Sequence, residues 1–258
     1  MFKGYLRAAL VALSLVSMPC WADLTPAELM NTTALRSLGQ RIAKSYMMIG
    51  SDVLVDVANK QLRQSIESFE HNKQILADNA PNADIRDALV KLDKTWQDYK
   101  ALVQAAPGKE QAVKVVSVGN HLLDECQKIT DMLEKANGDK ASHFVNRSGR
   151  DRLMSQRIAM LYLARSWGVQ APDLEDAFNA SVKEFETVLD ELKEAGTPNQ
   201  EIAVALRKVE AQWKFTTMAA GFSQPNQFVP TAMATSADKL YDKVNDLTRL
   251  YAALPVNQ

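Results

Sequence analysis

The chain repeats itself at an offset of 116 or 117 residues. The segment "QRIAKSYM" at 40–47 returns as "QRIAMLYL" at 156–163, and "SIESFE" at 65–70 returns as "SVKEFE" at 181–186. A longer match joins "PNADIRDALVKL" at 81–92 to "PNQEIAVALRKV" at 198–209. Because the matches keep their order, the sequence predicts two copies of one structural unit. We expect the first copy over residues 23–137 and the second over residues 140–258.

Each copy is predicted to be helical. Long stretches of Ala, Leu, Lys, Glu and Gln, which favour helices, run between a few glycine and proline breaks. No stretch alternates polar residues with β-branched ones, so no sheet is expected. The fold class is therefore all-α, a pseudo-two-fold tandem pair of antiparallel four-helix bundle units. The breaks place eight helices at about 27–49, 52–78, 82–105, 109–136, 140–167, 172–195, 198–221 and 230–253.

Residues 1–22 have the pattern of a secretory signal peptide. Two basic residues precede an apolar run over 8–16, and the segment ends in Cys20-Trp21-Ala22, which predicts cleavage after Ala22. The apolar run is shorter than the roughly 20 residues that a membrane span needs. A lipid anchor on Cys20 is disfavoured, because Pro19 stands where a small residue is expected. We therefore expect an exported, periplasmic protein.

Charge and cysteine content limit the partners of the exported chain. The sequence has 30 Lys and Arg against 31 Asp and Glu, and two of the basic residues leave with the signal peptide. The small negative balance argues against a nucleic-acid partner. No second long apolar run follows, so the mature chain is not expected to span a membrane. Cys126 then has no internal disulfide partner; it is either a buried small hydrophobe or a reactive or intermolecular thiol.

A basic segment recurs in the first helix of each copy. "LRSLGQR" at 35–41 and "NRSGRDRLMSQR" at 146–157 share the pattern R-x-x-x-Q-R. The shared residues are Arg36, Gln40 and Arg41 in the first copy and Arg152, Gln156 and Arg157 in the second.

Small residues lie on the same helix face as the first arginine of each pattern. They are Gly39 and Ala43 in one copy and Ser155 and Ala159 in the other, and such spacing allows two helix backbones to approach closely. If these helices pack together, two arginines meet, and they repel unless an anion lies between them. The planar guanidinium suits oxyanions and carboxylates. The alternative is that both arginines pair only with the chain's own carboxylates.

The segment "NRSGRDRLMSQRIAMLYL" resembles a signature helix of known sensors. This helix belongs to the periplasmic domain shared by NarX-type nitrate/nitrite sensor kinases and the pilus chemotaxis transducer PilJ. The family pattern runs roughly I-N-x-A-G-x-x-R-M-x-S-x-R. It is matched by Val145, Asn146, Gly149, Arg152, Ser155 and Arg157, with Ser148 in place of the alanine and Met154 one place from the methionine.

The resemblance implies a site for a small anion at the two-fold interface between signature helices. Arg152 is the implied anion contact and, through the repeat, so is Arg36. The implied neighbours are Gly149, Ser155, Gln156, Arg157, Gln40 and Arg41. The first copy departs from the pattern, since Thr33 stands where the glycine belongs and Ala34 replaces Arg150.

The favoured function is therefore binding of a small inorganic anion, first nitrate or nitrite, or of another small acid. The resemblance implies a tandem sensor domain whose second copy replaces the dimer partner and that carries no signalling module of its own. The alternative is a protein-interaction module that docks on a membrane receptor or on a type IV pilus or chemosensory component. No catalytic activity, cofactor or metal is expected, because His71, His121 and His143 lack ligand spacing and no phosphate loop or nucleophile–base pairing is visible.

Overall fold

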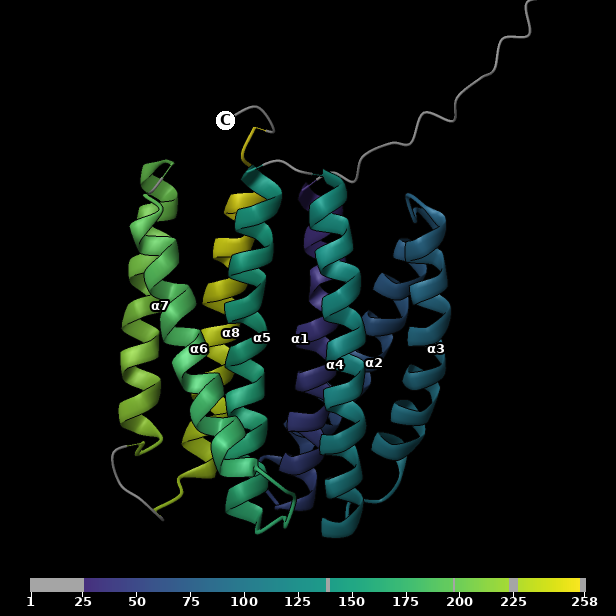
Figure 1. Cartoon of the computed structure of the whole chain (residues 1–258). Coiled ribbons are helices and arrows are strands. Elements are labelled where there is room, and N and C mark those ends of the chain that lie inside the picture. The colour runs from purple at the N-terminus through teal and green to yellow at the C-terminus, as the bar shows by residue number, and fades with distance from the viewer. Residues whose placement is uncertain (1–25, 138–139, 197, 223–226, 256–258) are drawn as a thin grey trace, which may run out of the picture.

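A computed structural model of the chain describes residues 26–137, 140–196, 198–222 and 227–255, so the predicted signal peptide over 1–22 lies outside the described residues. Within those ranges every regular element is a helix, which confirms the all-α class (Figure 1). The helices are α1 (Pro26–Gly50), α2 (Val55–Asp78), α3 (Ala83–Gln104), α4 (Lys109–Asn137), α5 (Lys140–Trp167), α6 (Leu174–Glu194), α7 (Gln200–Ala219) and α8 (Pro230–Ala252).

Four helices begin later than the sequence predicts, and the backbone explains why. Leu54 and Asp173 precede α2 and α6 with positive φ angles of 47° and 58°, which interrupt the helical path. Asn82 and Asn199 precede α3 and α7 in extended conformation. Each side-chain oxygen accepts a hydrogen bond of 2.9 Å from the amide three residues on, so both asparagines are N-caps rather than helical residues.

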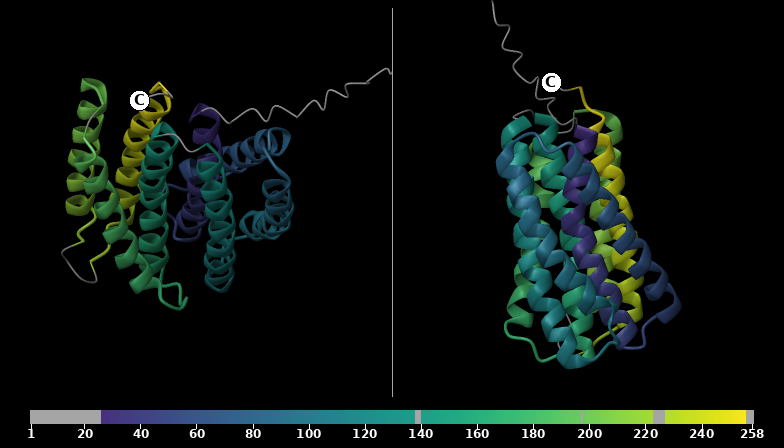
Figure 2. Two further views of the ribbon diagram at one scale, coloured as in Figure 1. Left: turned by 45° about the horizontal axis from the view of Figure 1, so that its top comes forward. Right: turned by 90° about the vertical axis from the view of Figure 1, so that its right-hand side faces the viewer.

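Helices α1 and α5 lie side by side at the centre of the molecule (Figures 1 and 2). Helix α1 also packs on α2 and α4, while α5 packs on α6 and α8. The outer helices α3 and α7 pack on α4 and α8 respectively. Helix α1 also contacts α8, and α4 contacts α5, so these four helices form the central layer of the molecule. The interface between α1 and α5 therefore joins the two repeats of the sequence.

Aromatic pairs anchor the core at equivalent positions of the repeat. Phe69 stacks on Trp96 with ring centroids 3.9 Å apart, and Phe185 meets Trp213 at 4.3 Å. Both tryptophans are buried, as is typical of large aromatic side chains that anchor a core. Cys126 is also buried, in agreement with the prediction of a small core residue. These contacts repeat along the chain, while the division into two superposable four-helix units stays a prediction.

Two tyrosines fasten loops to the central helices. The Tyr46 hydroxyl accepts a hydrogen bond from the amide of Gly108 at 3.2 Å. The Tyr162 hydroxyl accepts one from the amide of Val229 at 2.7 Å and donates to the carbonyl of Ala220 at 2.8 Å. Packing at the helix ends therefore repeats as well. None of the helices described here is both long and apolar enough to cross a bilayer.

Candidate functional site

Each central helix sends one arginine into the interface between α1 and α5. Arg36 and Arg152 occupy the same position in the two repeats, and each is only 1% exposed. The Nη2 atom of Arg36 donates to the carbonyl of Asn146 on α5 at 3.4 Å. In return, the Nη2 atom of Arg152 donates to the carbonyl of Met30 on α1 at 3.2 Å. The two arginines thus cross the interface in opposite directions to equivalent carbonyls.

Amide side chains on the neighbouring helices hold the other guanidinium nitrogens. Arg36 Nη1 donates to Gln127 Oε1 on α4 at 2.6 Å, and Arg152 Nη1 donates to Asn245 Oδ1 on α8 at 2.9 Å. The arginine pattern alone did not identify these amides. A repeat search extended to the last helix of each copy would have matched residue 127 with residue 245, since both are amides on the corresponding helix.

Neither buried arginine has a carboxylate partner among the residues that the structure describes. Across the residues that the structure describes, no Asp or Glu oxygen forms an ion pair with Arg36 or Arg152. The Nε atom of each is buried and has no hydrogen-bond partner within the described part of the chain. A buried charge is costly unless an opposite charge compensates it. The alternative in which these two arginines pair with the chain's carboxylates is therefore wrong for the described residues.

The pKa values of both arginines reflect this environment. Burial, followed by repulsion from Arg150 and Arg152, lowers the pKa of Arg36 to about 9, and Asp131 and Cys126 oppose the change. Burial also lowers the pKa of Arg152. A bound anion would favour the charged form of both groups.

Gly149 lies directly against the arginine of the opposite helix. A Cβ atom on Gly149 would lie 3.2 Å from Arg36 Nη2 and 3.2 Å from Thr33 Oγ1. Thr33 in turn accepts a hydrogen bond from Arg152 Nη2 at 3.1 Å. The structure therefore brings Arg36, Arg152 and Gly149 together, and it adds Thr33, the position of the repeat that corresponds to Gly149.

One of the small residues, Gly39, has different surroundings from those predicted. Gly39 was expected to face α5, but a Cβ atom on Gly39 would have Leu122 of α4 as its nearest side-chain neighbour, at 3.6 Å. Ser155 is buried, and its hydroxyl donates to the carbonyl of Arg152 in its own helix at 2.7 Å. The close approach between the central helices is thus clearest at Gly149.

Gln40 and Gln156 are buried, and they keep one atom each without a partner. Gln156 donates from Nε2 to the carbonyl of Ala237 on α8 at 3.3 Å. Within the ranges that the structure describes, the Oε1 atoms of both glutamines have no hydrogen-bond partner. They lie one helical turn beyond Arg36 and Arg152 and add buried acceptors to the two central helices.

Arg41 and Arg157 contact the last helix of the opposite repeat. Arg41 lies 4.0 Å from Asp238 of α8 and 4.7 Å over the ring of Tyr241. Arg157 donates to Asn120 Oδ1 of α4 at 2.7 Å. Both arginines therefore link the two repeats at positions away from the reciprocal bonds of Arg36 and Arg152.

A buried lysine adds to the contact between α1 and α8, and the contact between α5 and α4 has no equivalent lysine. Lys44 is fully buried and pairs through Nζ with Asp238, which also accepts a hydrogen bond from Gln61 Nε2 at 3.0 Å. Burial lowers the pKa of Lys44 to about 8, against the opposing effect of Asp238. The corresponding residue of the second repeat is Met160, so this ion pair has no counterpart there.

A second buried polar group without a counterpart in the other repeat lies beside Arg152 in the chain. Asp151 is fully buried, neither of its oxygens has a hydrogen-bond partner among the described residues, and burial raises its pKa well above the usual value. Burial and the charge of Asp151 together raise the pKa of Tyr251 to about 12. The Tyr251 hydroxyl also has no hydrogen-bond partner in the described part of the chain. The first repeat has Leu35 in place of Asp151.

The buried guanidinium groups present hydrogen-bond donors at this interface. No cluster of three or more His, Cys, Asp or Glu side chains occurs within the described residues. Comparisons of the chain with protein-family models, with curated proteins and with solved structures gave no match.

Proposed function

We propose that the chain binds a small anion between α1 and α5, at Arg36 and Arg152. The observation that carries the proposal is the reciprocal pair of buried guanidinium groups with neutral acceptors and no ion-pair partner among the described residues. An anion here would supply the missing negative charge and accept from the two unpartnered Nε groups.

The proposed ligand class is a small planar oxyanion, with nitrate or nitrite first. A guanidinium group presents its donors in one plane, which suits a planar acceptor. The choice of nitrate and nitrite rests on the resemblance of residues 146–163 to the signature helix of NarX- and PilJ-type sensor domains. With the predicted signal peptide, the proposed role is that of an exported, periplasmic sensor-like binding protein.

Calorimetric titration in chloride-free buffer tests the proposal. We expect the parent protein to bind nitrate or nitrite and Arg152→Lys to bind about tenfold to a hundredfold more weakly, because a charge-assisted hydrogen bond contributes roughly 1.5–3 kcal/mol. Arg147→Lys is the matched control, since Arg147 lies on the same helix and pairs with Glu191 at its surface. Equal affinity of parent and Arg152→Lys would contradict the anion site.

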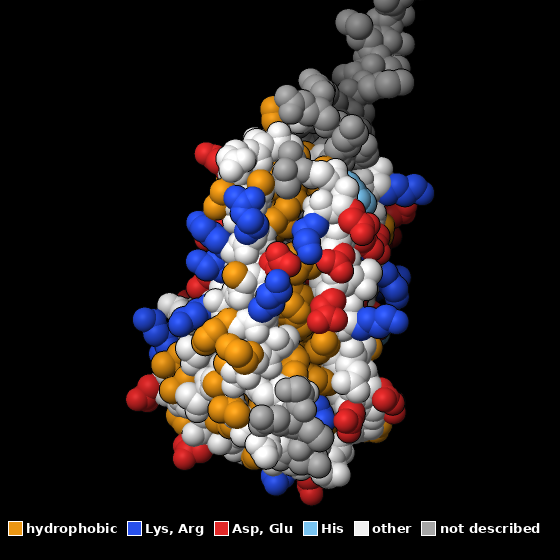
Figure 3. Space-filling model, turned by 90° about the vertical axis from the view of Figure 1, so that its left-hand side faces the viewer, with side chains coloured by type: hydrophobic (Ala, Val, Ile, Leu, Met, Phe, Trp, Pro, Cys, Tyr) orange, Lys and Arg blue, Asp and Glu red, His pale blue; other side chains and the backbone are white. Residues whose placement is uncertain are grey.

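Protein docking is a second candidate, and a specific surface feature favours it. Hydrophobic side chains gather in the lower half of the face that carries α7 (Figure 3). Phe215 and Met218 near the end of α7 are 48% and 73% exposed, and Phe228 and Val229 before α8 are 36% and 44% exposed. Docking would be favoured by two results together. The first is that calorimetric titration of the protein with small acids gives no binding heat. The second is that the parent protein binds a partner in the membrane fraction and Met218→Gln does not.

A further inference from the structure

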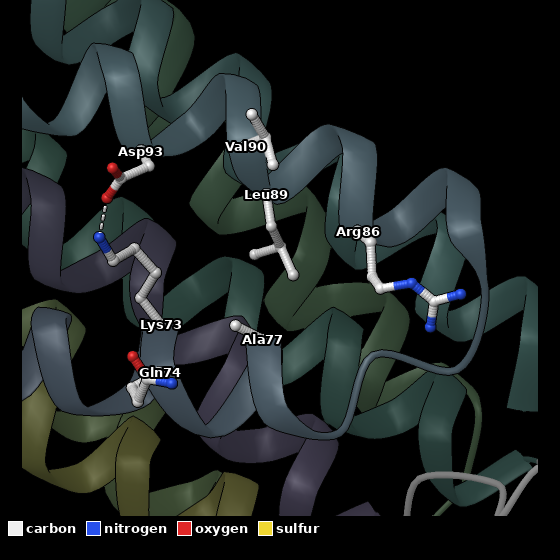
Figure 4. Close-up of a pocket in the computed structure, with 7 residues that line it drawn as sticks. All are labelled: Lys73, Gln74, Ala77, Arg86, Leu89, Val90 and Asp93. Carbon is white, nitrogen blue, oxygen red and sulfur yellow. Dashed lines mark hydrogen bonds and ion pairs between the residues drawn. The ribbon is translucent and has the colours of Figure 1, made fainter.

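A groove lies between α2 and α3, away from the central interface. It encloses about 490 Å³, within the roughly 300–1,000 Å³ typical of small-molecule sites. Figure 4 shows Leu89 of α3 pointing towards Ala77 of α2, with Arg86 beyond them and the pair of Lys73 and Asp93 on the other side.

The groove combines an apolar wall with a positive balance of charge. Its apolar lining comes from Ala77, Leu89 and Val90, and Val90 is 72% exposed.

The charged residues lie on either side of this apolar wall. Lys73 Nζ forms an ion pair with Asp93 on one side. On the other side, Arg86 Nη1 donates to the carbonyl of Ala80 at 3.2 Å. Two cations and one carboxylate thus line the groove, and an anion is favoured over a cation.

In the second repeat, longer charged side chains occupy the positions that correspond to Ala77 and Val90. Lys193 stands where Ala77 stands in the first repeat, and its Nζ lies 3.2 Å from Asp190 and 3.5 Å from Glu210 of α7. Lys193 therefore spans from α6 to α7 where the first repeat has only a methyl group. At the place of Val90 the second repeat has Arg207. The first repeat alone combines a short side chain and an apolar wall at these positions.

We propose that the groove between α2 and α3 binds a small amphiphilic carboxylate. Its apolar body would lie over Ala77, Leu89 and Val90, and its carboxylate would lie at Arg86. Arg86 and Asp93 are seven residues apart on α3, which corresponds to about 10 Å along a helix. This length suits a medium-chain fatty acid or an aryl-alkanoic acid. The groove is separate from Arg36 and Arg152, so this proposal does not depend on the anion proposed there.

Residue-resolved NMR titration of the signal-free chain with octanoate tests the groove. We expect saturable shifts of the amides of α2 and α3 around Ala77 and Leu89. Octylammonium, with the same apolar body and the opposite charge, is expected to bind at least several-fold more weakly. Arg86→Gln should weaken octanoate binding up to about fivefold, which matches a solvent-exposed ion pair.

Ala77→Lys copies the residue found at this place in the second repeat and should abolish the shifts. Because Ala77 is exposed, the variant keeps the core intact. Ala101→Lys places the same charge on an exposed position of α3 outside the groove and should bind octanoate like the parent. Undiminished binding in Ala77→Lys, or octanoate shifts confined to residues around Arg152, would overturn the proposal.

Discussion

Arg36 and Arg152 each donate a hydrogen bond to a backbone carbonyl of the helix that carries the other. The accepting carbonyls, Asn146 and Met30, are themselves equivalent in the repeat. The exchange ties α1 to α5 without any carboxylate of the described residues. It also places two positive charges at one interface. The same two side chains therefore link the helices and require a compensating negative charge.

Replacement of glycine by alanine should have opposite effects at two positions. Gly39→Ala should raise the free energy of unfolding by about 0.5–1 kcal/mol, because alanine favours the helix and its Cβ meets Leu122 at an ordinary 3.6 Å. Gly149→Ala should be about 1–3 kcal/mol less stable than Gly39→Ala, because its Cβ would crowd Arg36 and Thr33 at 3.2 Å. Urea unfolding of both variants measures the difference. If both variants were stabilised equally, the side chains around Gly149 would have moved to accommodate the added methyl group, and the prediction would be wrong.

Loss of the Asn245 amide should destabilise the protein through Arg152. Asn245→Leu leaves Arg152 Nη1 without its 2.9 Å acceptor, and we expect a loss of about 1–3 kcal/mol in the free energy of unfolding. In a double-mutant cycle, Asn245→Leu should cost much less when Arg152 is already methionine. Additive losses would mean that the two side chains are not coupled.

Lys44 should make stability rise with pH in the alkaline range. Its pKa is about 8 in the folded protein against an ordinary 10.5, so the unfolded chain binds the proton more tightly. Between these values deprotonation favours the folded state, by up to about 3 kcal/mol. Lys44→Met, which copies Met160, should remove this rise. The measurement is the parent-minus-variant difference in unfolding free energy at pH 7.5, 9 and 10.5; a constant difference would contradict the prediction.

Asp151→Leu should stabilise the protein at neutral pH. The substitution copies Leu35 and removes a buried carboxyl group without hydrogen-bond partners, which we expect to add about 1–3 kcal/mol. Because burial raises the pKa of Asp151, the folded state disfavours the ionised form and loses stability as pH rises above the ordinary pKa. The gain should therefore be larger at pH 7 than at pH 4. A gain independent of pH would argue against ionisation as the cause.

Export should remove the first 22 residues. Mass spectrometry of the protein from a periplasmic extract is expected to show a chain that begins at Asp23. Ala22→Arg should block cleavage and leave the longer chain. A lipid-modified N-terminus at Cys20 would instead support the disfavoured anchor.

The sequence was sufficient for the helices because glycine, proline and asparagine mark most of their ends. It was insufficient at Leu54 and Asp173, whose positive φ angles are uncommon for residues other than glycine. The arginine pattern also grouped Arg41 and Arg157 with Arg36 and Arg152. Five residues along a helix rotate a side chain by about 140°, so these arginines reach α8 and α4 instead.

Other groups of the candidate site depend on contacts across the fold. Gln127 and Asn245 lie about 90 residues from the arginines they hold, on helices that the arginine pattern does not include. One is a glutamine and the other an asparagine, and they match at an offset of 118 residues rather than at the 116 or 117 of the repeat. The unmatched carboxyl of Asp151 could be recognised only after its burial was known, because an isolated aspartate in a helical stretch is typical of a solvated surface.

The pairing of Thr33 with Gly149 has a consequence for ligand orientation. In a dimer of identical chains, a residue change on one side of a two-fold axis occurs on the other side too. Here both sides belong to one polypeptide, so Thr33 adds a hydroxyl and a methyl group to one wall while Gly149 leaves bare backbone on the other. A molecule with distinguishable ends, held between these walls, would meet unlike surroundings at each end and would sit in one preferred direction.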